Sequence, residues 1–248
     1  MRLENKIILL TGAARGVGLA TAKCFVAEGA KVIMTDINSE RLQAQATALG
    51  ADFVEHDVST ELHWQTITAK IAKDYGHLDG LFNNAAILQS ASIEAETLEG
   101  WQRIQKVNAD SVFLGIKYCL PLLEVHGGSI VNMSSSSALM GLSQFCAYTA
   151  AKAAVRSLTM STAVLCKQKA NKVRCNSIHP DGINTDMVRE MSAQLTDEQR
   201  GDYKRSIPFV CQPEDVANLA LFLVSDESRH MNGAALSLDN TATIHPPY

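Results

Sequence analysis

The sequence predicts an α/β fold, a single doubly wound domain in which helices flank a parallel sheet of about seven strands. Short apolar runs alternate along the chain with longer stretches of helical periodicity, an order typical of strands joined by crossover helices. Most of the short runs are continuously apolar rather than alternating, as expected of parallel strands covered on both faces. No Pro-, Gly- or Ser-rich linker and no internal repeat divides the chain, so we expect residues 1–248 to form one domain.

The predicted elements follow one another in a regular order. The strands are expected at Lys6–Thr11, Lys31–Asp36, Asp52–Asp57, Leu78–Asn83, Ser129–Ser134, Val173–His179 and Ala235–Leu238. The helices are expected at Gly18–Glu28, Ser39–Leu49, Glu61–Tyr75, Leu98–Val125, Ala147–Lys169 and Pro213–Ser225. Crossovers between parallel strands place every carboxyl end at the same edge of the sheet, and the loops at that edge are where we expect a ligand site.

The composition excludes several classes of protein. The 248 residues include 22 basic and 26 acidic side chains, a net charge of −4 that argues against general nucleic-acid binding. An apolar share of 46% excludes a disordered chain. The six cysteines and seven histidines show no C-x-x-C pair or metal-ligand spacing, so we expect reduced thiols and no metal. The first apolar run, Ile7–Leu10, is too short for a signal sequence or a membrane span of about 20 residues, and we expect a cytoplasmic protein with no membrane partner.

A glycine-rich turn, T-G-A-A-R-G-V-G at residues 11–18, lies between the first strand and the first helix. Glycines let the backbone turn tightly and approach a pyrophosphate, which then meets the positive end of the helix. The spacing is G-x-x-x-G-x-G, because Thr21 stands where the commoner G-x-G-x-x-G pattern has its third glycine. An ordinary tight turn is the alternative, but the position between strand and helix favours a nucleotide. The residues predicted to contact it are Gly12, Arg15, Gly16, Val17 and Gly18.

An acidic residue, Asp36, ends the second strand. A carboxylate at this place can accept hydrogen bonds from ribose hydroxyls, and it repels a 2′-phosphate. Two unit charges ~4 Å apart at an effective dielectric of ~20 cost about 4 kcal/mol. Arg15, beside the glycine turn, could instead pair with that phosphate, or it is a solvated loop residue. On this balance Asp36 predicts NAD rather than NADP.

Four motifs occur in one order: the glycine turn, N-N-A-A at residues 83–86, a serine run at residues 134–137, and Tyr148 with Lys152. The set resembles the short-chain dehydrogenase/reductase family, in its branch of single-domain enzymes, from Leu3 to about Asn240. The resemblance implies a Rossmann-type fold and hydride transfer between a nicotinamide cofactor and an alcohol or ketone. It also implies a homo-oligomer, a dimer or tetramer, that pairs the helices near Leu98–Val125 and Ala147–Lys169.

The chemistry of the last motif supports a general base. Tyr148 and Lys152 are spaced i and i+4 and share one helix face. A tyrosine pKa near ~10 is too high for a base at neutral pH, and lowering it enough takes about 4 kcal/mol of preference for the phenolate. One ammonium a few ångströms away in a desolvated cleft can supply this. The alternative is an ordinary surface pair on a helix.

The resemblance implies the remaining site residues. Ser135, thirteen residues before Tyr148, would hold the substrate oxygen, and Asn108 would support a proton relay through a water and Lys152. Further cofactor contacts are implied at Ile37, Asp57, Val58, Asn84, Ala85, Ala86, Tyr148, Lys152, Pro180, Ile183 and Thr185.

Two stretches depart from the usual family pattern. Asp181 and Ala86 each stand where the family commonly has glycine, and we expect Gly182 to supply the backbone freedom lost at Asp181. The H-P-D-G-I stretch at residues 179–183 and the D-N pair at residues 239–240 are similar to bacterial 3β/17β-hydroxysteroid dehydrogenases.

A substrate lid is predicted at residues 186–207. Met187, Val188, Met191 and Leu195 recur at helical spacing, and T-D-E-Q at residues 196–199 indicates a capping box that opens another short helix. The methionines would form an adaptable wall for a bulky alicyclic substrate, unless this is a plain amphipathic helix packed on the body. Other expected pocket residues are Leu88, Ser137, Leu139 and Gln144.

The sequence thus predicts an NAD-dependent alcohol dehydrogenase or ketone reductase with a small-molecule substrate, a hydroxysteroid or a similar cyclic alcohol. An NADPH-dependent 3-oxoacyl reductase is the alternative within enzymes, supported only by Arg15. A non-catalytic nucleotide-binding or interaction protein on the same fold is the alternative from another class.

Overall fold

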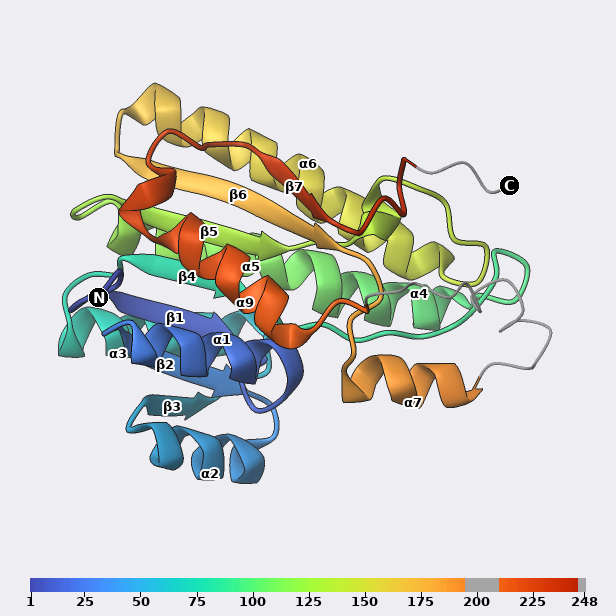
Figure 1. The fold of residues 1–248 in the computed structure, drawn as a ribbon, viewed down its shortest axis with the longest axis horizontal. Helices are drawn as coiled ribbons and strands as arrows, with labels where there is room; N and C mark the ends of the chain where they lie inside the picture. Colours follow the sequence, from blue (N-terminus) through green and yellow to red (C-terminus); the bar gives the residue numbers. More distant parts are fainter. Residues whose placement is uncertain (195–209, 245–248) are drawn as a thin grey trace.

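The computed structural model describes residues 1–194 and 210–244, which form a seven-stranded sheet with helices on both faces (Figure 1). Every strand pair is parallel, and the spatial order is β3-β2-β1-β4-β5-β6-β7. The strands are β1 Ile7–Thr11, β2 Lys31–Asp36, β3 Asp52–Glu55, β4 Gly80–Asn83, β5 Gly128–Met133, β6 Val173–Pro180 and β7 Ala235–Leu238. The order reverses between β1 and β4, and such a switch point opens a crevice at the carboxyl ends of the strands.

The helices cover the sheet in two sets. They are α1 Gly16–Ala27, α2 Ser39–Leu49, α3 Glu61–Asp74, α4 Leu98–Gln105, α5 Ser111–Leu123, α6 Cys146–Lys169, α7 Asp186–Gln194 and α9 Pro213–Val224. One core cluster joins the sheet to α1, α2 and α9, and a second joins it to α3, α5 and α6 (Figure 1). Alternate residues of β1 belong to different clusters, Ile8 to the first and Leu9 to the second, which explains why the strand is apolar at every position.

Local chemistry places the ends of several helices. The Asn38 side chain caps α2 by accepting a hydrogen bond from Arg41 N at 3.0 Å, and the helix ends at Gly50 with φ 63°. Helix α9 begins with Pro213 inside a capping box formed by Gln212 and Asp215. These polar and glycine residues satisfy backbone groups that a helix leaves unpaired at its ends.

The structure confirms the predicted fold class and shifts some element boundaries. The first helix begins at Gly16, two residues before its predicted start, and the third strand ends at Glu55 rather than Asp57. The single helix predicted over Leu98–Val125 is interrupted by a π-helical turn at Lys106–Asp110, which separates α4 from α5. The residues that flank this turn keep helical dihedrals, so the chain reads as helical on both sides of it.

The predicted lid is only partly described. Helix α7 occupies its first residues, and Leu195 and the capping box predicted at Thr196–Gln199 lie outside the described residues. In the part of the chain that the structure describes, no helix combines the length and apolarity needed to cross a membrane.

The two-sided core allows a direct test with one pair of phenylalanines. Phe25 of α1 is completely buried, whereas Phe53 on β3 is 40% exposed. Phe25→Ala should cost about 3–5 kcal/mol of unfolding free energy because it leaves a cavity between α1 and the sheet. The matched variant Phe53→Ala should cost about 1 kcal/mol or less. Urea unfolding at one protein concentration measures both, and equal losses would contradict this packing.

Candidate active site

A cavity of about 730 Å³ lies at the carboxyl ends of the strands. Seventeen of the residues predicted from the sequence line it: Gly12, Arg15, Gly16, Val17, Asp36, Ile37, Asp57, Val58, Asn84, Ala85, Ala86, Ser135, Tyr148, Lys152, Pro180, Ile183 and Thr185. Among the predicted catalytic and cofactor-binding residues, Gly18 and Asn108 are the two that do not. The fold thus brings the glycine turn and the candidate catalytic residues, far apart in sequence, to one cavity.

The glycine turn is shaped by close approach of the backbone. Gly12 has φ 65°, and a Cβ there would lie 2.8 Å from the Cα of Ala85. A Cβ at Gly18 would lie only 2.0 Å from Gly12 O, so this glycine closes the turn rather than facing the cavity. The Asn84 side chain fastens the turn by donating to Thr11 O at 2.9 Å and to Gly12 O at 3.2 Å.

The helix that follows this turn is open to an anion. Helix α1 has no side-chain cap at its first residues and no acidic residue in its first turn, in contrast to the capped α2. Gly16 and Val17, the first residues of α1, line the cavity. The unpaired backbone N–H groups and the positive end of the helix dipole therefore face the cavity there. This arrangement fits the pyrophosphate of a dinucleotide.

Asp36 and Arg15 hold different partners at this end of the cavity. Asp36 Oδ2 accepts a hydrogen bond from Ala14 N at 3.0 Å, and Oδ1 accepts one from Asn38 N at 3.0 Å. The carboxylate is thus held at the turn with lone pairs left for further donors. Arg15 donates to Glu190 of α7 at 2.9 Å. The pair is solvent-exposed and contributes modestly, but it gives Arg15 an acidic partner within the chain.

Tyr148 and Lys152 lie on α6 facing the end of β5. Lys152 is almost completely buried, its Nζ donates to Met133 O at 2.8 Å, and it lies 5.5 Å from the centroid of the Tyr148 ring. Burial lowers the pKa of Lys152 to about 8. Burial raises the pKa of Tyr148 to about 12, and a hydrogen bond with the Ser135 side chain acts in the opposite direction. Ser135, Tyr148 and Lys152 therefore form one connected group.

The four consecutive serines have distinct surroundings. The Ser134 hydroxyl donates to Lys152 O at 2.9 Å and ties β5 to α6. Ser135 Oγ accepts from Ser137 N at 3.2 Å and lines the cavity. Ser136 and Ser137 lie in a short 3₁₀ turn, as expected of loop serines. Ser135, the serine that the family spacing selects, is thus the one linked to Tyr148.

His179 is a neighbour of this group that the sequence analysis did not single out. It is buried, and its Nδ1 lies 3.1 Å from Ser135 O while its Nε2 lies 2.8 Å from Ser177 Oγ. A carbonyl oxygen only accepts, so Nδ1 carries the proton and Nε2 accepts from the Ser177 hydroxyl. Burial lowers the pKa of His179, consistent with a neutral ring that positions the Ser135 backbone. The sequence signal that could have identified His179 is its position directly before Pro180, a predicted cofactor contact.

Asn108 has its side chain fully engaged. Its Oδ1 accepts from Ile87 N at 3.1 Å, and its Nδ2 donates to Ile87 O at 3.0 Å and to Ile104 O at 3.1 Å. The side chain is buried inside the π turn and clamps the segment after β4. A π turn displaces main-chain hydrogen bonds and is frequent at functional sites. Any part that Asn108 plays in a proton relay therefore falls to its main chain.

Asp181 lines the cavity without straining the loop. Neither Asp181 nor Gly182 has a positive φ, and a Cβ at Gly182 would meet nothing within 4 Å. The expectation that Gly182 supplies special backbone freedom is therefore wrong, because this turn asks for none. The Asp181 carboxyl is partly buried, and this burial is the main reason why its pKa is raised. The negative charge of the nearby Asp239 raises the pKa further.

The other end of the cavity is mostly apolar. It is lined by Ile87, Leu88, Val107, Met187 and Val188, so α7 contributes one methionine and one valine of the expected wall. Ser137, Leu139, Gln144 and Met191 are not among the lining residues. The charged residues Glu99, Arg103 and Lys106 also line the cavity, and the sequence analysis did not identify them because they lie on the polar face of a helix.

Comparisons with known proteins agree with this geometry. A short-chain dehydrogenase family model, described as "Enoyl-(Acyl carrier protein) reductase", matches residues 12–243. The chain is 40% identical to a 3-beta-hydroxysteroid dehydrogenase of Comamonas testosteroni, with 97% of this chain and 96% of the relative covered. It is 37% identical to the 2,5-dichloro-2,5-cyclohexadiene-1,4-diol dehydrogenase LinX of Sphingobium indicum, with 96% of each chain covered.

Two further proteins show the range of the similarity. An NADP-dependent (R)-specific alcohol dehydrogenase of Lentilactobacillus kefiri is 35% identical, with 98% of each chain covered. The crystal structure of gox2181 superposes with a TM-score of 0.90 at 26% identity over 98% of both chains. The chain therefore belongs to the short-chain dehydrogenase/reductase family, and it is an oxidoreductase of alcohols and ketones in a family that uses nicotinamide cofactors.

Proposed function

We propose that the chain is an NAD-dependent dehydrogenase/reductase that interconverts a secondary alcohol and a ketone on an apolar cyclic or steroid-like substrate. The observation that carries the proposal is the connected group Ser135, Tyr148 and Lys152 in the same cavity as the glycine turn and Asp36. A protein that only bound a nucleotide would need the glycine turn and Asp36. It would not need the connected group of serine, tyrosine and lysine. Residues 1–248 act as one catalytic domain, with residues 186–207 as the lid.

The residues at the nucleotide end support NAD. The backbone of Gly16 and Val17 would hold the pyrophosphate, Asp36 the ribose, and Pro180, Ile183 and Thr185 the nicotinamide end. The Asp36 carboxylate would repel a 2′-phosphate, and Arg15, the cation best placed for that phosphate, already pairs with Glu190. Family membership does not decide this point, since the Lentilactobacillus relative is NADP-dependent. When bound, NAD supplies a hydride acceptor.

The catalytic group would move one proton while hydride leaves the substrate carbon. Ser135 donates a hydrogen bond to the substrate oxygen and orients it. The deprotonated Tyr148 oxygen would accept the hydroxyl proton as the C–H electron pair departs, and the protonated oxygen would return it in ketone reduction. Lys152, with a pKa of about 8, is mainly an ammonium at neutral pH, and a positive charge 5.5 Å from the centre of the Tyr148 ring would favour the phenolate. The main chain of the π turn at Asn108 would support the relay of that proton toward solvent.

The substrate end supports an uncharged, apolar body. Ile87, Leu88, Val107, Met187 and Val188 offer aliphatic and thioether surface to an apolar body. Two relatives carry the names of dehydrogenases of ring-bearing alcohols, a hydroxysteroid and a cyclohexadienediol. These points favour a cyclic substrate over a 3-oxoacyl one.

The setting of the enzyme is also part of the proposal. We propose a cytoplasmic homo-oligomer in which α5 and α6 meet their counterparts. Phe113 on α5 is 49% exposed and Leu165 on α6 is 44% exposed, and a partner copy would cover these apolar side chains.

Removing the Tyr148 hydroxyl tests the mechanism. Tyr148→Phe should lower turnover of an accepted cyclic alcohol by about 10²–10⁴-fold, because the proton acceptor is lost. NAD binding, followed by fluorescence titration, should remain close to that of the native protein. The control Tyr118→Phe removes an exposed hydroxyl that contacts Glu61 and should leave turnover unchanged. Equal turnover in Tyr148→Phe would refute the assignment.

Neutralising Asp36 tests the choice of cofactor. Asp36→Asn should raise the ratio of kcat/KM for NADP to that for NAD by about tenfold or more, because repulsion of the 2′-phosphate is removed. Adding Glu190→Gln should raise the ratio further by releasing Arg15. Glu40→Gln, an exposed acid of α2 outside the cavity, is the matched control. A native protein that already prefers NADPH would contradict the proposal.

Lys152 gives the folded protein a characteristic pH dependence. Its folded pKa of about 8 lies below the ordinary lysine value of 10.5, so between these values the unfolded chain binds more protons and Lys152 adds stability as pH rises. The gain should approach about 3 kcal/mol. The difference in unfolding free energy between the native protein and Lys152→Met, measured from pH 7 to pH 10, should show this gain. Replacement of the exposed Lys31 by Met is the control, and a pH-independent difference would sink the assignment.

A further inference from the structure

Asp181 is an acid in the wall of the candidate active site to which the proposed reaction gives no part. It directly follows β6 and lines the carboxyl-end cavity together with Pro180, Ile183 and Thr185, the residues proposed above to hold the nicotinamide end. The family commonly has glycine at this position, and the backbone does not explain the change, because the φ of Asp181 is not positive. The carboxyl group itself therefore needs an explanation.

The Asp181 carboxyl has no compensating partner in the chain. Its Oδ1 atom is buried and accepts no hydrogen bond, and no other buried or half-buried carboxyl in residues 1–194 and 210–244 has such an oxygen. No lysine, arginine or histidine of these residues forms an ion pair with it. A carboxylate in such a place keeps most of its field, because burial limits the contact of its oxygen with water.

The other aspartates that line the carboxyl-end cavity are compensated. Both oxygens of Asp36 accept backbone N–H groups, as described above. Asp57 Oδ1 accepts from Ser59 N at 2.9 Å, and Asp186 Oδ1 accepts from the Arg189 guanidinium at 2.7 Å. Partners of this kind disperse the charge of a carboxylate. Asp181 is therefore the aspartate of this wall whose charge is left for the cavity.

Two titratable groups face Asp181 from neighbouring segments. The backbone N of Asp181 donates to Leu238 O at 3.3 Å, and the next residue of that strand end is the buried Asp239. Cys211, which precedes α9, lies close enough for the Asp181 charge to affect it, and burial above all raises the pKa of its thiol to about 11. The thiol is thus neutral at ordinary pH, and Asp239 is another acid. Neither group cancels a negative charge on Asp181.

A negative charge in this wall would distinguish the two oxidation states of a nicotinamide. The oxidised ring carries a positive charge, whereas the reduced ring is neutral. Hydride transfer from the alcohol carbon removes that positive charge, while the hydroxyl proton goes to the Tyr148 oxygen. A nearby carboxylate therefore attracts the oxidised ring and does little for the reduced one.

We propose that Asp181 sets the balance between the two oxidation states of the bound cofactor, because its carboxylate strengthens the binding of NAD⁺ relative to NADH. The inference rests on the proposed function, since it takes the nicotinamide to lie at Pro180 and Ile183. At an effective dielectric of ~20, two unit charges ~10 Å apart change an equilibrium constant by about tenfold.

The consequence is a preferred direction of the reaction. A tenfold preference for NAD⁺ lowers the two-electron reduction potential of the bound cofactor by about 30 mV. Bound NADH is then the stronger reductant, and the site favours ketone reduction over alcohol oxidation.

Binding measurements without any alcohol or ketone test the inference. Isothermal titration calorimetry of the full chain at pH 8 gives Kd for NADH and Kd for NAD⁺, and we call the first divided by the second the affinity ratio. Asp181→Asn, which keeps the shape and removes the charge, should lower this ratio about tenfold, chiefly by weakening NAD⁺. Asp181→Gly should lower it equally, because the charge rather than a hydrogen bond is responsible. Urea-unfolding midpoints at or above that of the native protein verify folding, since both variants remove an unpartnered carboxyl.

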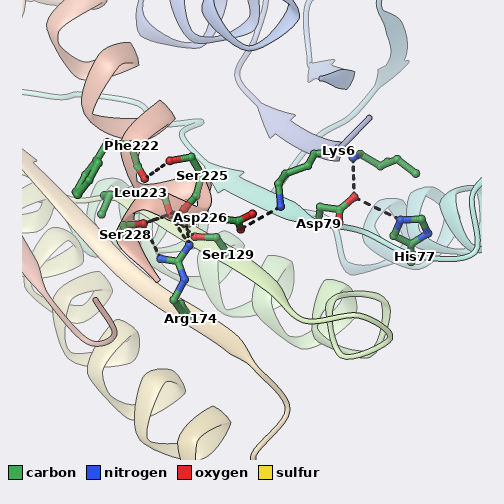
Figure 2. A network of polar contacts seen from close by, with 11 residues as sticks. Lys6, His77, Asp79, Ser129, Arg174, Phe222, Leu223, Ser225, Asp226 and Ser228 are labelled. Atoms are coloured by element: carbon green, nitrogen blue, oxygen red, sulfur yellow. Dashed lines mark hydrogen bonds and ion pairs between the residues drawn. The ribbon is translucent and has the colours of Figure 1, made fainter. Parts of the chain in front are cut away.

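Asp79 provides the matched control. It is half-buried like Asp181, but it precedes β4 at the other edge of the sheet and does not line the carboxyl-end cavity. Its Oδ2 accepts from Ile7 N at 2.8 Å and lies 3.4 Å from His77 Nε2, as Figure 2 shows. Asp79→Asn removes the same charge from the chain and keeps an oxygen acceptor, so the affinity ratio should not change.

The pH dependence separates the charge of Asp181 from its shape. Protonation removes the charge, so the affinity ratio of the native protein should fall as the pH is lowered from 8 to 5. Because burial raises the pKa of Asp181, the fall should begin above the usual range of an aspartate. Asp239 and Lys152 titrate in Asp181→Asn as well, so the difference between the two profiles isolates Asp181.

The outcomes distinguish this inference from the proposed function. An affinity ratio that Asp181→Asn leaves unchanged, with both cofactors still bound, would overturn the inference alone. A lower ratio in Asp181→Asn but not in Asp181→Gly would also overturn it, because a local hydrogen bond would then be the cause. A native protein that prefers NADP(H) contradicts the proposed cofactor, and NADP⁺ and NADPH, whose rings carry the same charges, then give the ratio. Failure of all four cofactors to bind would refute both.

Discussion

Burial of the parallel sheet on both faces is the constraint on which the rest of this structure depends. Neighbouring residues of a strand, such as Ile8 and Leu9, pack into different helical layers, so helices cover both faces of the sheet. Groups that bind or react must then lie at the ends of the strands, where loops and helix termini begin. The cavity that joins the glycine turn to Tyr148 lies at one of these edges, the carboxyl edge.

At the carboxyl edge, the polar groups are held by a network of hydrogen bonds rather than by packing alone. Lys152 is a buried cation whose desolvation is only partly offset by its bond to Met133 O. Ser134 and His179 hold the backbone on either side of Ser135, through Lys152 O and Ser135 O respectively. Such a network costs stability and maintains geometry, which is the usual balance at a site of chemistry.

Glycine and asparagine residues serve the same edge by controlling backbone approach. Gly12 and Gly18 permit contacts that a Cβ would prevent. Asn84 then binds the carbonyl groups of the turn, and Asn108 binds the main chain of Ile87 in both directions. The cavity is therefore bounded by backbone that side-chain amides hold in place, and the Asn108 amide does so from within the π turn.

By itself, the sequence determined the fold class, the strands, most of the helices and many of the residues that line the carboxyl-end cavity. Those features depend on local periodicity, on glycine at tight turns and on motif spacing, all of which are read along the chain. Only the tertiary structure decided which partners meet: His179 with Ser135, Arg15 with Glu190, and Asp181 with Asp239. It also decided the π turn and the relaxed backbone at Asp181. These features depend on contacts between segments far apart in sequence, and a linear pattern carries no information about the direction in which a side chain points after folding.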